Sequence, residues 1–173
     1  MNRILQLVLV VLLLAALPAA ASVYQTREDF LAEVFDGKPP PARSLWLRGA
    51  LKQEVTSVLG HPYGRLRVRY WERDGRRAWV LEEIGKERPI TFGVVTRDGR
   101  IENIRVLAFR ESRGWEIRHP FFTRQFFGAR LDEKQRLDRQ IDGISGATLS
   151  VRAMKKVARL ALLLDHHVAS SAP

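Results

Sequence analysis

The chain of 173 residues contains no cysteine. This absence excludes disulfide bonds, thiolate metal sites, iron–sulfur clusters, haem attached through a Cys-x-x-Cys-His motif and a lipid-modified N-terminal cysteine. Any redox chemistry of the protein therefore depends on a cofactor that binds without thiols.

Acidic residues are also scarce, with 19 Asp and Glu against 29 Lys and Arg, which gives a formal net charge of +10. Such a charge favours acidic partners or an anionic membrane surface. Hydrophobic residues make up 46% of the chain and charged residues 28%, values that exclude a disordered chain and a multi-pass membrane protein. The length fits a single domain.

The longest apolar run lies at residues 4–17, where Arg3 precedes it and Pro18 and Ala19-Ala20-Ala21 follow. This is the layout of a secretory signal peptide with an A-x-A cleavage site, so we predict that residues 1–21 are removed on export. The alternative is an uncleaved anchor in the cytoplasmic membrane, because the segment is long enough to span a bilayer. Both interpretations place the domain in the periplasm or another extracytoplasmic space, where nucleic acid is not the expected partner.

Residues 22–48 are predicted to form a helix followed by a proline-rich arm. Thr26 is a typical N-cap with acidic residues in the turn after it, and Pro39-Pro40-Pro41 cannot continue a helix. A second helix is predicted over residues 49–59, because Gly60 provides a C-terminal stop.

Residues 65–109 show the two-residue period of antiparallel strands. Leu66, Val68 and Tyr70 alternate with arginines at 65, 67 and 69, and Asp-Gly turns at 74–75 and 98–99 join successive strands. The pattern predicts two hairpins, which make about four strands. The arginine face is either a docking surface for an acidic protein or an anionic membrane, or an ordinary solvated face. Its expected members are Arg65, Arg67, Arg69, Arg73, Arg76 and Arg77.

Helical periodicity returns after the strands, with a short helix over 121–127 closed by Gly128 and a longer one beginning near Leu149. The sequence therefore predicts an α+β fold, a single domain in which helices flank an antiparallel sheet of about four strands. The histidines at 61, 119, 166 and 167 lack metal-ligand spacing, and we expect no metal site.

A run of small residues, Asp142-Gly143-Ile144-Ser145-Gly146-Ala147-Thr148-Leu149-Ser150, leads into the last helix. Free N–H groups and the helix dipole can hold a phosphate there, and small side chains let an anion approach the backbone. The competing interpretation is a plain loop in which Ser145, Thr148 or Ser150 caps the helix.

The same run resembles the flavinylation motif of the FMN-binding domain family, which includes flavin subunits of the Rnf and sodium-translocating quinone reductase complexes. Two further segments are similar to that family: 109–114 resembles its Glu-Thr/Ser-x-Gly segment, and 122–128 its Phe-x-x-Gln-Phe-x-Gly helix end. The resemblance implies that residues 49–173 form an FMN-binding domain, in which FMN is attached by a flavin transferase, from FAD, through a phosphoester to Thr148.

The resemblance also implies a set of cofactor-binding residues. Asp142 would hold the loop or be read by the transferase, or simply form an Asx turn. Trp115 would stack on the flavin or be a buried residue at the sheet edge. Glu111 and Ser112 would contact the ring or ribityl chain, or be a solvated strand end. The full expected set is Asp142, Gly143, Ser145, Gly146, Ala147, Thr148, Leu149, Glu111 and Ser112.

The function that these features predict is an exported flavoprotein that relays electrons between membrane or periplasmic electron-transfer proteins. No catalytic acid, base or substrate pocket can be identified in the sequence, so an electron carrier is favoured over an enzyme. Two alternatives remain: a flavin-dependent reductase that acts directly on a small acceptor, and a sensor or interaction module that carries no flavin.

Overall fold

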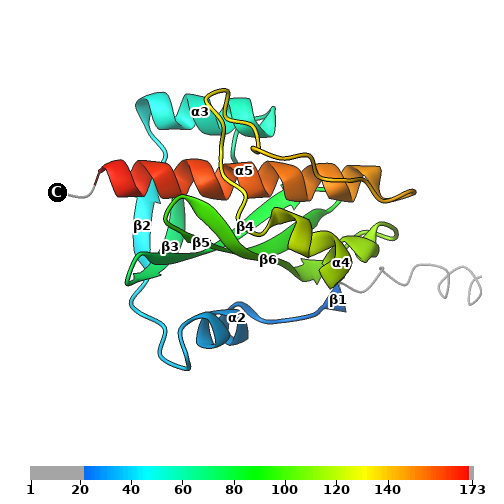
Figure 1. Ribbon diagram of the computed structural model, residues 1–173, viewed down its shortest axis with the longest axis horizontal. Coiled ribbons are helices and arrows are strands. Elements are labelled where there is room, and N and C mark those ends of the chain that lie inside the picture. The colour runs from blue at the N-terminus through cyan, green and yellow to red at the C-terminus, as the bar shows by residue number, and fades with distance from the viewer. Residues whose placement is uncertain (1–21, 172–173) are drawn as a thin grey trace, which may run out of the picture.

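The computed structural model describes residues 22–171, whose centre is a six-stranded antiparallel sheet with the order β1-β6-β5-β4-β3-β2 (Figure 1). The α+β prediction is confirmed, but the expected number of about four strands is too low. The strands are β1 (Ser22–Val23), β2 (Arg43–Trp46), β3 (Arg67–Arg73), β4 (Arg76–Ile84), β5 (Pro89–Arg97) and β6 (Arg100–Phe109).

The two strands that the sequence did not reveal are the edge strands β1 and β2, with two and four residues. Segments this short are set by backbone pairing with a neighbour that is already in place, here β6 and β3, and they show no period of their own. Both flank the predicted N-terminal helix, so the segment before residue 49 frames the two edges of the sheet.

Helices cover both faces of the sheet. The long helix α5 crosses one face with α3 beside it, and α2 lies on the opposite face (Figure 1). The helices are α2 (Arg27–Val34), α3 (Gly49–Leu59), α4 (Pro120–Thr123) and α5 (Thr148–Ser170), with 3-10 turns η1 (Trp115–Arg118) and η2 (Arg124–Phe126). Among residues 22–171, no helix is both long and apolar enough to cross a membrane. The predicted signal peptide lies outside the described residues.

Local signals in the sequence are realised where they were expected. Thr26 caps α2, with its hydroxyl accepting a hydrogen bond from the Asp29 N–H at 3.0 Å. Gly60 ends α3 in the left-handed conformation. At the first hairpin Asp74 and Gly75 both have positive φ, 51° and 74°, as a tight turn between twisted strands requires.

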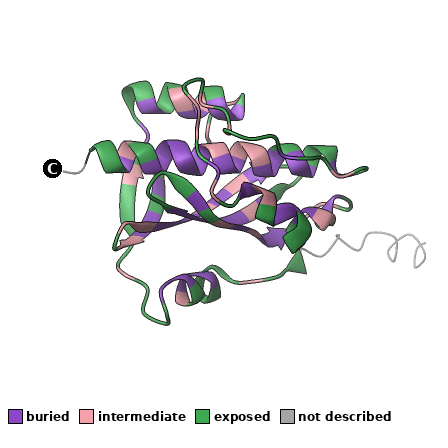
Figure 2. Ribbon diagram, in the orientation of Figure 1, coloured by how far each residue is buried: buried purple, intermediate pink, exposed green. Residues whose placement is uncertain are grey.

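The main core fills the space between the sheet and the helices α5 and α3 (Figure 2). Trp79 and Phe92 on the sheet and Met154 on α5 are completely buried. A smaller core lies under α2, where Gly93 admits Phe30, because a Cβ at Gly93 would come within 2.7 Å of the Phe30 ring. Apolar side chains of the helices therefore cover part of each face of the sheet.

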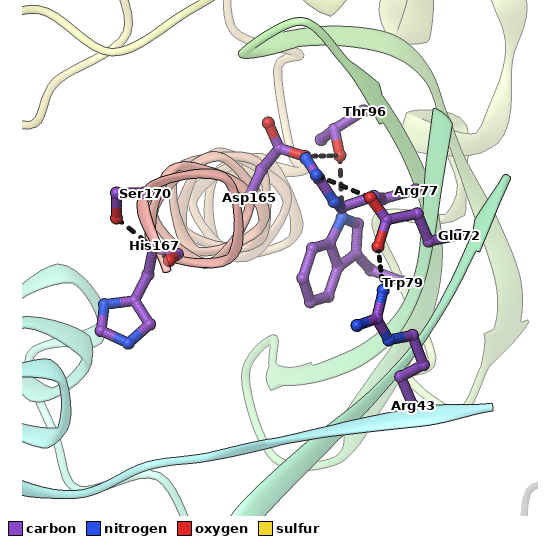
Figure 3. A network of polar contacts seen from close by, with 8 residues as sticks. All are labelled: Arg43, Glu72, Arg77, Trp79, Thr96, Asp165, His167 and Ser170. Carbon is purple, nitrogen blue, oxygen red and sulfur yellow. Dashed lines mark hydrogen bonds and ion pairs between the residues drawn. The ribbon is translucent and has the colours of Figure 1, made fainter. Parts of the chain in front are cut away.

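A buried ionic network joins α5 to the sheet (Figure 3). Asp165, 1% exposed, accepts hydrogen bonds from Arg77 Nη1 at 3.0 Å and from the Thr96 hydroxyl at 2.7 Å. The same Thr96 Oγ1 accepts from Trp79 Nε1 at 2.9 Å, and Glu72 Oε1 accepts from Arg77 Nη2 at 2.7 Å. Arg77 and Thr96 are register partners on adjacent strands, so the network fixes the helix to one strand position. The expectation that Arg77 belongs to an exposed arginine face is wrong, because the residue is 8% exposed and its side chain is turned to Asp165.

The network predicts an unequal response of two arginines to the same substitution. Arg77→Gln leaves the Asp165 carboxylate buried without its charge partner, and we expect the free energy of unfolding to fall by about 3–5 kcal/mol. Arg65 forms an exposed pair with Glu82 at 2.8 Å, so Arg65→Gln should cost less than about 1 kcal/mol. Urea denaturation of both variants measures the difference, and equal losses would contradict a structural role for the network.

Candidate functional site

The loop that leads into α5 is tied to its surroundings through its backbone. The N–H of Asp142 donates to Gln125 Oε1 at 2.8 Å, and the carbonyl of Ile141 accepts from Lys155 Nζ at 2.6 Å. Ala147, 2% exposed, anchors the other end in the core. Between these anchors Gly143, Ser145 and Gly146 are exposed, so the loop presents its backbone to solvent.

The start of α5 has no side-chain cap. Ala147 occupies the N-cap position, and the first turn contains no acidic residue. The interpretation in which Ser145, Thr148 or Ser150 caps this helix is therefore wrong. The first-turn N–H groups and the positive end of the helix dipole remain available to an anion, and the exposed Thr148 hydroxyl lies beside them.

The segment after β6 meets the beginning of α5 at Gly114. A Cβ built on Gly114 would lie 2.3 Å from Ser150 Oγ and 3.6 Å from the Cα of Ala147, and its φ of +89° suits glycine alone. Together with the contact of Gln125 to the loop, this brings all three segments that resemble the FMN-binding family to one place. Sequence order keeps them apart, and the close approach at Gly114 explains why the glycine is there.

Glu111 holds a turn. Its Oε1 accepts the backbone N–H groups of Lys86, Glu87 and Arg88, all within 2.9 Å. Burial alone would raise the pKa of Glu111, but the three donors stabilise the anion and the net effect on the pKa is downward. One carboxylate oxygen is thus committed to the β4–β5 turn. Ser112 is exposed, and contact of either residue with a flavin stays a prediction.

Exposed rings surround the same region. Trp115 is 42% exposed and Phe121 64%, and His119 lies between them, 5.4 Å from the Trp115 ring and 6.1 Å from the Phe121 ring. We call Trp115, His119 and Phe121 the aromatic ledge. The expectation of a buried Trp115 is wrong, because the chain leaves the sheet after Phe109 and Trp115 begins the separate turn η1. That turn packs on α5, which places the ledge beside the helix that Thr148 begins.

Some contributors to the site were not identified from the sequence as individual residues. Gln125 lies within a segment whose resemblance had been noted, so its contact with Asp142 could have been suspected. Lys155 gave no signal, since its bond to Ile141 depends on how the loop folds back over α5. Within residues 22–171, no group of three or more His, Asp or Glu side chains is placed to hold a metal ion.

The fold and these contacts define a small α+β domain. The start of its last helix can accept an anion, the hydroxyl of Thr148 lies at that start, and exposed aromatic rings lie beside it. Residues 85–163 match the family model of the FMN-binding domain. The resemblance to this family is thereby confirmed over these residues, and the match supports a flavin-binding protein. No curated protein and no solved structure matched the chain. The geometry suits FMN, because its phosphate needs the free N–H groups and its ring an apolar surface.

The contact at Gly114 predicts different effects of two glycine substitutions. Gly114→Ala forces a Cβ against Ser150 at a strained φ, so we expect the free energy of unfolding to fall by about 1–3 kcal/mol and flavin binding to weaken as the start of α5 shifts. Gly64→Ala is the matched control, because nothing lies within 4 Å of its Cβ position and the residue lies outside the loop. Thermal unfolding and flavin content measure both effects, and a harmless Gly114→Ala would show that this contact does not shape the site.

Proposed function

We propose that the protein carries FMN covalently, through a phosphoester to Thr148, and relays electrons between redox partners outside the cytoplasm. The observation that supports this proposal most is the exposed Thr148 at a helix start that has no side-chain cap and no acidic residue in its first turn. The free N–H groups there stabilise the charge that a phosphodiester keeps after it forms.

The attachment needs an external catalyst. Thr148 Oγ1 forms a bond to the phosphorus of the FMN half of FAD, the pyrophosphate bond breaks, AMP leaves, and the hydroxyl proton passes to a base. A threonine hydroxyl is a poor nucleophile without such a base or a metal. Within residues 22–171, no hydrogen bond orients the Thr148 hydroxyl, and no group of three or more His, Asp or Glu side chains is placed to hold a metal ion. A separate flavin transferase would supply both the base and the metal.

The exposed residues of the loop have assignable roles in this proposal. Gly143, Ser145 and Gly146 leave the backbone open to the phosphate, and the αL conformation of Gly146, φ +80°, turns the chain into the helix. Asp142 presents its carboxylate to solvent at the loop's start, where a transferase can read it. The small residues thus admit the phosphate, whereas Asp142 serves recognition by the transferase.

Apolar surface lies close to the attachment point. Leu149, 38% exposed, follows Thr148 directly, and the aromatic ledge lies on the turn that packs against α5. When bound there, FMN supplies an isoalloxazine ring that takes up and releases electrons. Leu149 and the ledge would shield one side of the ring from water and leave the other side open to a partner.

Two other functions are consistent with the same fold. A flavin-dependent reductase would bring a small acceptor directly to the ring, and purified protein would then reduce that acceptor. A sensor or interaction module would carry no flavin even when produced beside a flavin transferase. The electron carrier is favoured because the loop and the rings beside it are exposed, which leaves a bound flavin accessible to a protein partner.

The arginine face provides a surface for a redox partner. It lines a hollow of about 720 Å³ on the side of the sheet that α2 covers only in part, next to the edge strand β2. Arg67 and Arg69 are exposed, and Arg67 also lies over the ring of Trp46, 5.7 Å from its centroid. We propose that an acidic electron-transfer protein docks here, since opposite charge speeds encounter. An anionic membrane surface is the other candidate partner.

Export is proposed from the sequence pattern at residues 1–21. A mature chain that begins near Ser22 is the expected result of an intact-mass measurement, whereas a chain that retains Met1 would favour the membrane-anchored alternative.

Substitution of Thr148 tests the attachment site. Thr148→Ala removes the hydroxyl that must form the ester, so covalent flavin should be lost, while stability should change little because this exposed residue is not the N-cap. Thr148→Ser keeps a hydroxyl and should retain some flavin. Coexpression with a flavin transferase, digestion and mapping of the flavin-bearing peptide measure the outcome.

Ser145→Ala is the matched control, since Ser145 is exposed on the same loop and carries the other nearby hydroxyl. It should keep its flavin. Undiminished covalent flavin in Thr148→Ala, or a flavin ester mapped to Ser145 or Ser150 in the wild type, would contradict the assignment of Thr148.

Charge reversal tests the docking surface. Arg65→Glu, Arg67→Glu and Arg69→Glu together should slow electron exchange with an acidic partner, chiefly through the association rate, and the loss should shrink as salt rises. Stopped-flow kinetics at two ionic strengths measure this effect.

The control for net charge reverses three exposed cations on other parts of the molecule, Lys52, Arg97 and Lys134. Equal slowing by both triple variants would mean that total charge, rather than the arginine face, governs association. An unchanged rate in the first variant at low salt would mean that these arginines form an ordinary solvated face and not a docking surface.

A further inference from the structure

A second hollow lies on α5, on the same side of the helix as Thr148. It measures about 520 Å³ and lies between the end of α3, the loop at 136–141 and the exposed face of α5. Thr148, Arg152, Lys155 and Arg159 follow one another at helical spacing, so their side chains share one face. The hollow thus begins about one helical turn beyond the proposed flavin ester.

The lining of this hollow is strongly cationic. It contains six basic residues and no acidic one: Arg136, Arg139, Arg152, Lys155, Lys156 and Arg159. Three of these pair with carboxylates beside the hollow, Arg136 with Asp132, Arg139 with Asp138 and Lys156 with Glu83. Arg152, Lys155 and Arg159 form no salt bridge with a carboxylate among residues 22–171. Apolar side chains complete it, among them the buried Val58, Leu59 and Ile141. An apolar floor beneath several cations fits an anion that carries an apolar body, and the volume is within the range of about 300–1,000 Å³ for small-molecule sites.

Arg159 carries the strongest evidence that an anion belongs here. Its guanidinium is half-buried, and its Nε donates to the backbone carbonyl of Gln135 at 2.8 Å. No carboxylate in residues 22–171 forms a salt bridge with it. Burial lowers the pKa of Arg159, and Asp132 offsets this effect only in part. A desolvated guanidinium without a counter-ion is costly, and an oxyanion in the hollow would remove that cost.

Two lysines are held in place at the edge of the hollow. Lys155 donates to the Ile141 carbonyl at 2.6 Å, and Lys156 donates to Glu83 Oε1 at 2.9 Å. The Glu83 carboxylate, whose side chain is 2% exposed, also bonds to His61 at 3.0 Å. The charge of Lys155 is thus fixed in position by a neutral acceptor before any ligand arrives, which reduces the entropy lost on binding. The charge of Lys156 is balanced by Glu83.

We propose that this hollow binds a phosphorylated small molecule with an apolar body, held by Arg159 and Arg152 as forked donors and by Lys155 as a point charge. Several cations around one space match the multiple charge of a phosphate or pyrophosphate better than a single carboxylate. The source is either a soluble nucleotide or a phospholipid, because both join a phosphate to a less polar part, the base of the nucleotide or the acyl chains of the lipid. The proposal does not require flavin on Thr148.

The test uses the full mature chain with Thr148→Ala, so that no attached flavin can occupy the hollow. The probes for calorimetry are ADP, inorganic pyrophosphate, and phosphatidylcholine vesicles with and without phosphatidic acid. We expect saturable binding of ADP or of the phosphatidic acid vesicles. The probe that binds with the higher affinity shows whether the natural ligand is a nucleotide or a phospholipid. Pyrophosphate should bind less tightly than ADP, because it has no apolar part to contact the floor of the hollow.

Two variants of one residue separate charge from folding. Arg159→Gln should weaken binding at least about tenfold, as expected for the loss of a charge-assisted hydrogen bond, and Arg159→Lys should restore part of it. Arg100→Gln, a change at an arginine outside the hollow, should leave binding unaltered. Absence of binding to every probe, or equal affinity in Arg159→Gln and Arg100→Gln, would overturn the proposal. Loss of covalent flavin in Thr148→Ala is a separate result and does not affect this outcome.

Discussion

The packing of α5 across the sheet is the constraint on which the rest of the structure depends. The helix supplies one wall of the main core, and the bond of Asp165 to Arg77 and Thr96 fixes its position along the strands. Because a helix is stiff, fixing it near its C-terminal end also fixes where its first turn emerges. Thr148, the first residue of the helix, owes its location at the surface to contacts made 17 residues later along the same helix.

The surroundings of that first turn come from three distant parts of the chain. Gly114 lets the segment after β6 approach Ser150, Gln125 binds the backbone of Asp142, and Lys155 folds the loop back onto the helix. Each contact acts on the backbone and leaves the Thr148 hydroxyl and the first-turn N–H groups free. A site built in this way is rigid around its edges and open at its centre, as the attachment of a large cofactor requires.

The parts of the fold that the sequence predicted are those decided locally. Asp74 and Gly75 adopt the positive φ that their own tight turn requires, and Thr26 caps a helix by accepting a hydrogen bond from a residue three positions away. The ion pair of Arg77 and Asp165 spans 88 residues and left no periodic trace. The sequence leaves Trp115 either stacked on a flavin or buried at the sheet edge, and only the structure shows that the turn after Gly114 carries its ring outwards. For the site, the loop and Thr148 were identified by their resemblance to a family, while the partners that hold them became visible only in three dimensions.

A covalent bond between flavin and this chain is tested most directly by fluorescence of the denatured protein. The protein is produced beside a flavin transferase, denatured, separated on a gel and viewed under ultraviolet light. Flavin fluorescence should migrate with the polypeptide, because a phosphoester survives unfolding. Flavin that binds the native protein but leaves it on denaturation would contradict the covalent bond.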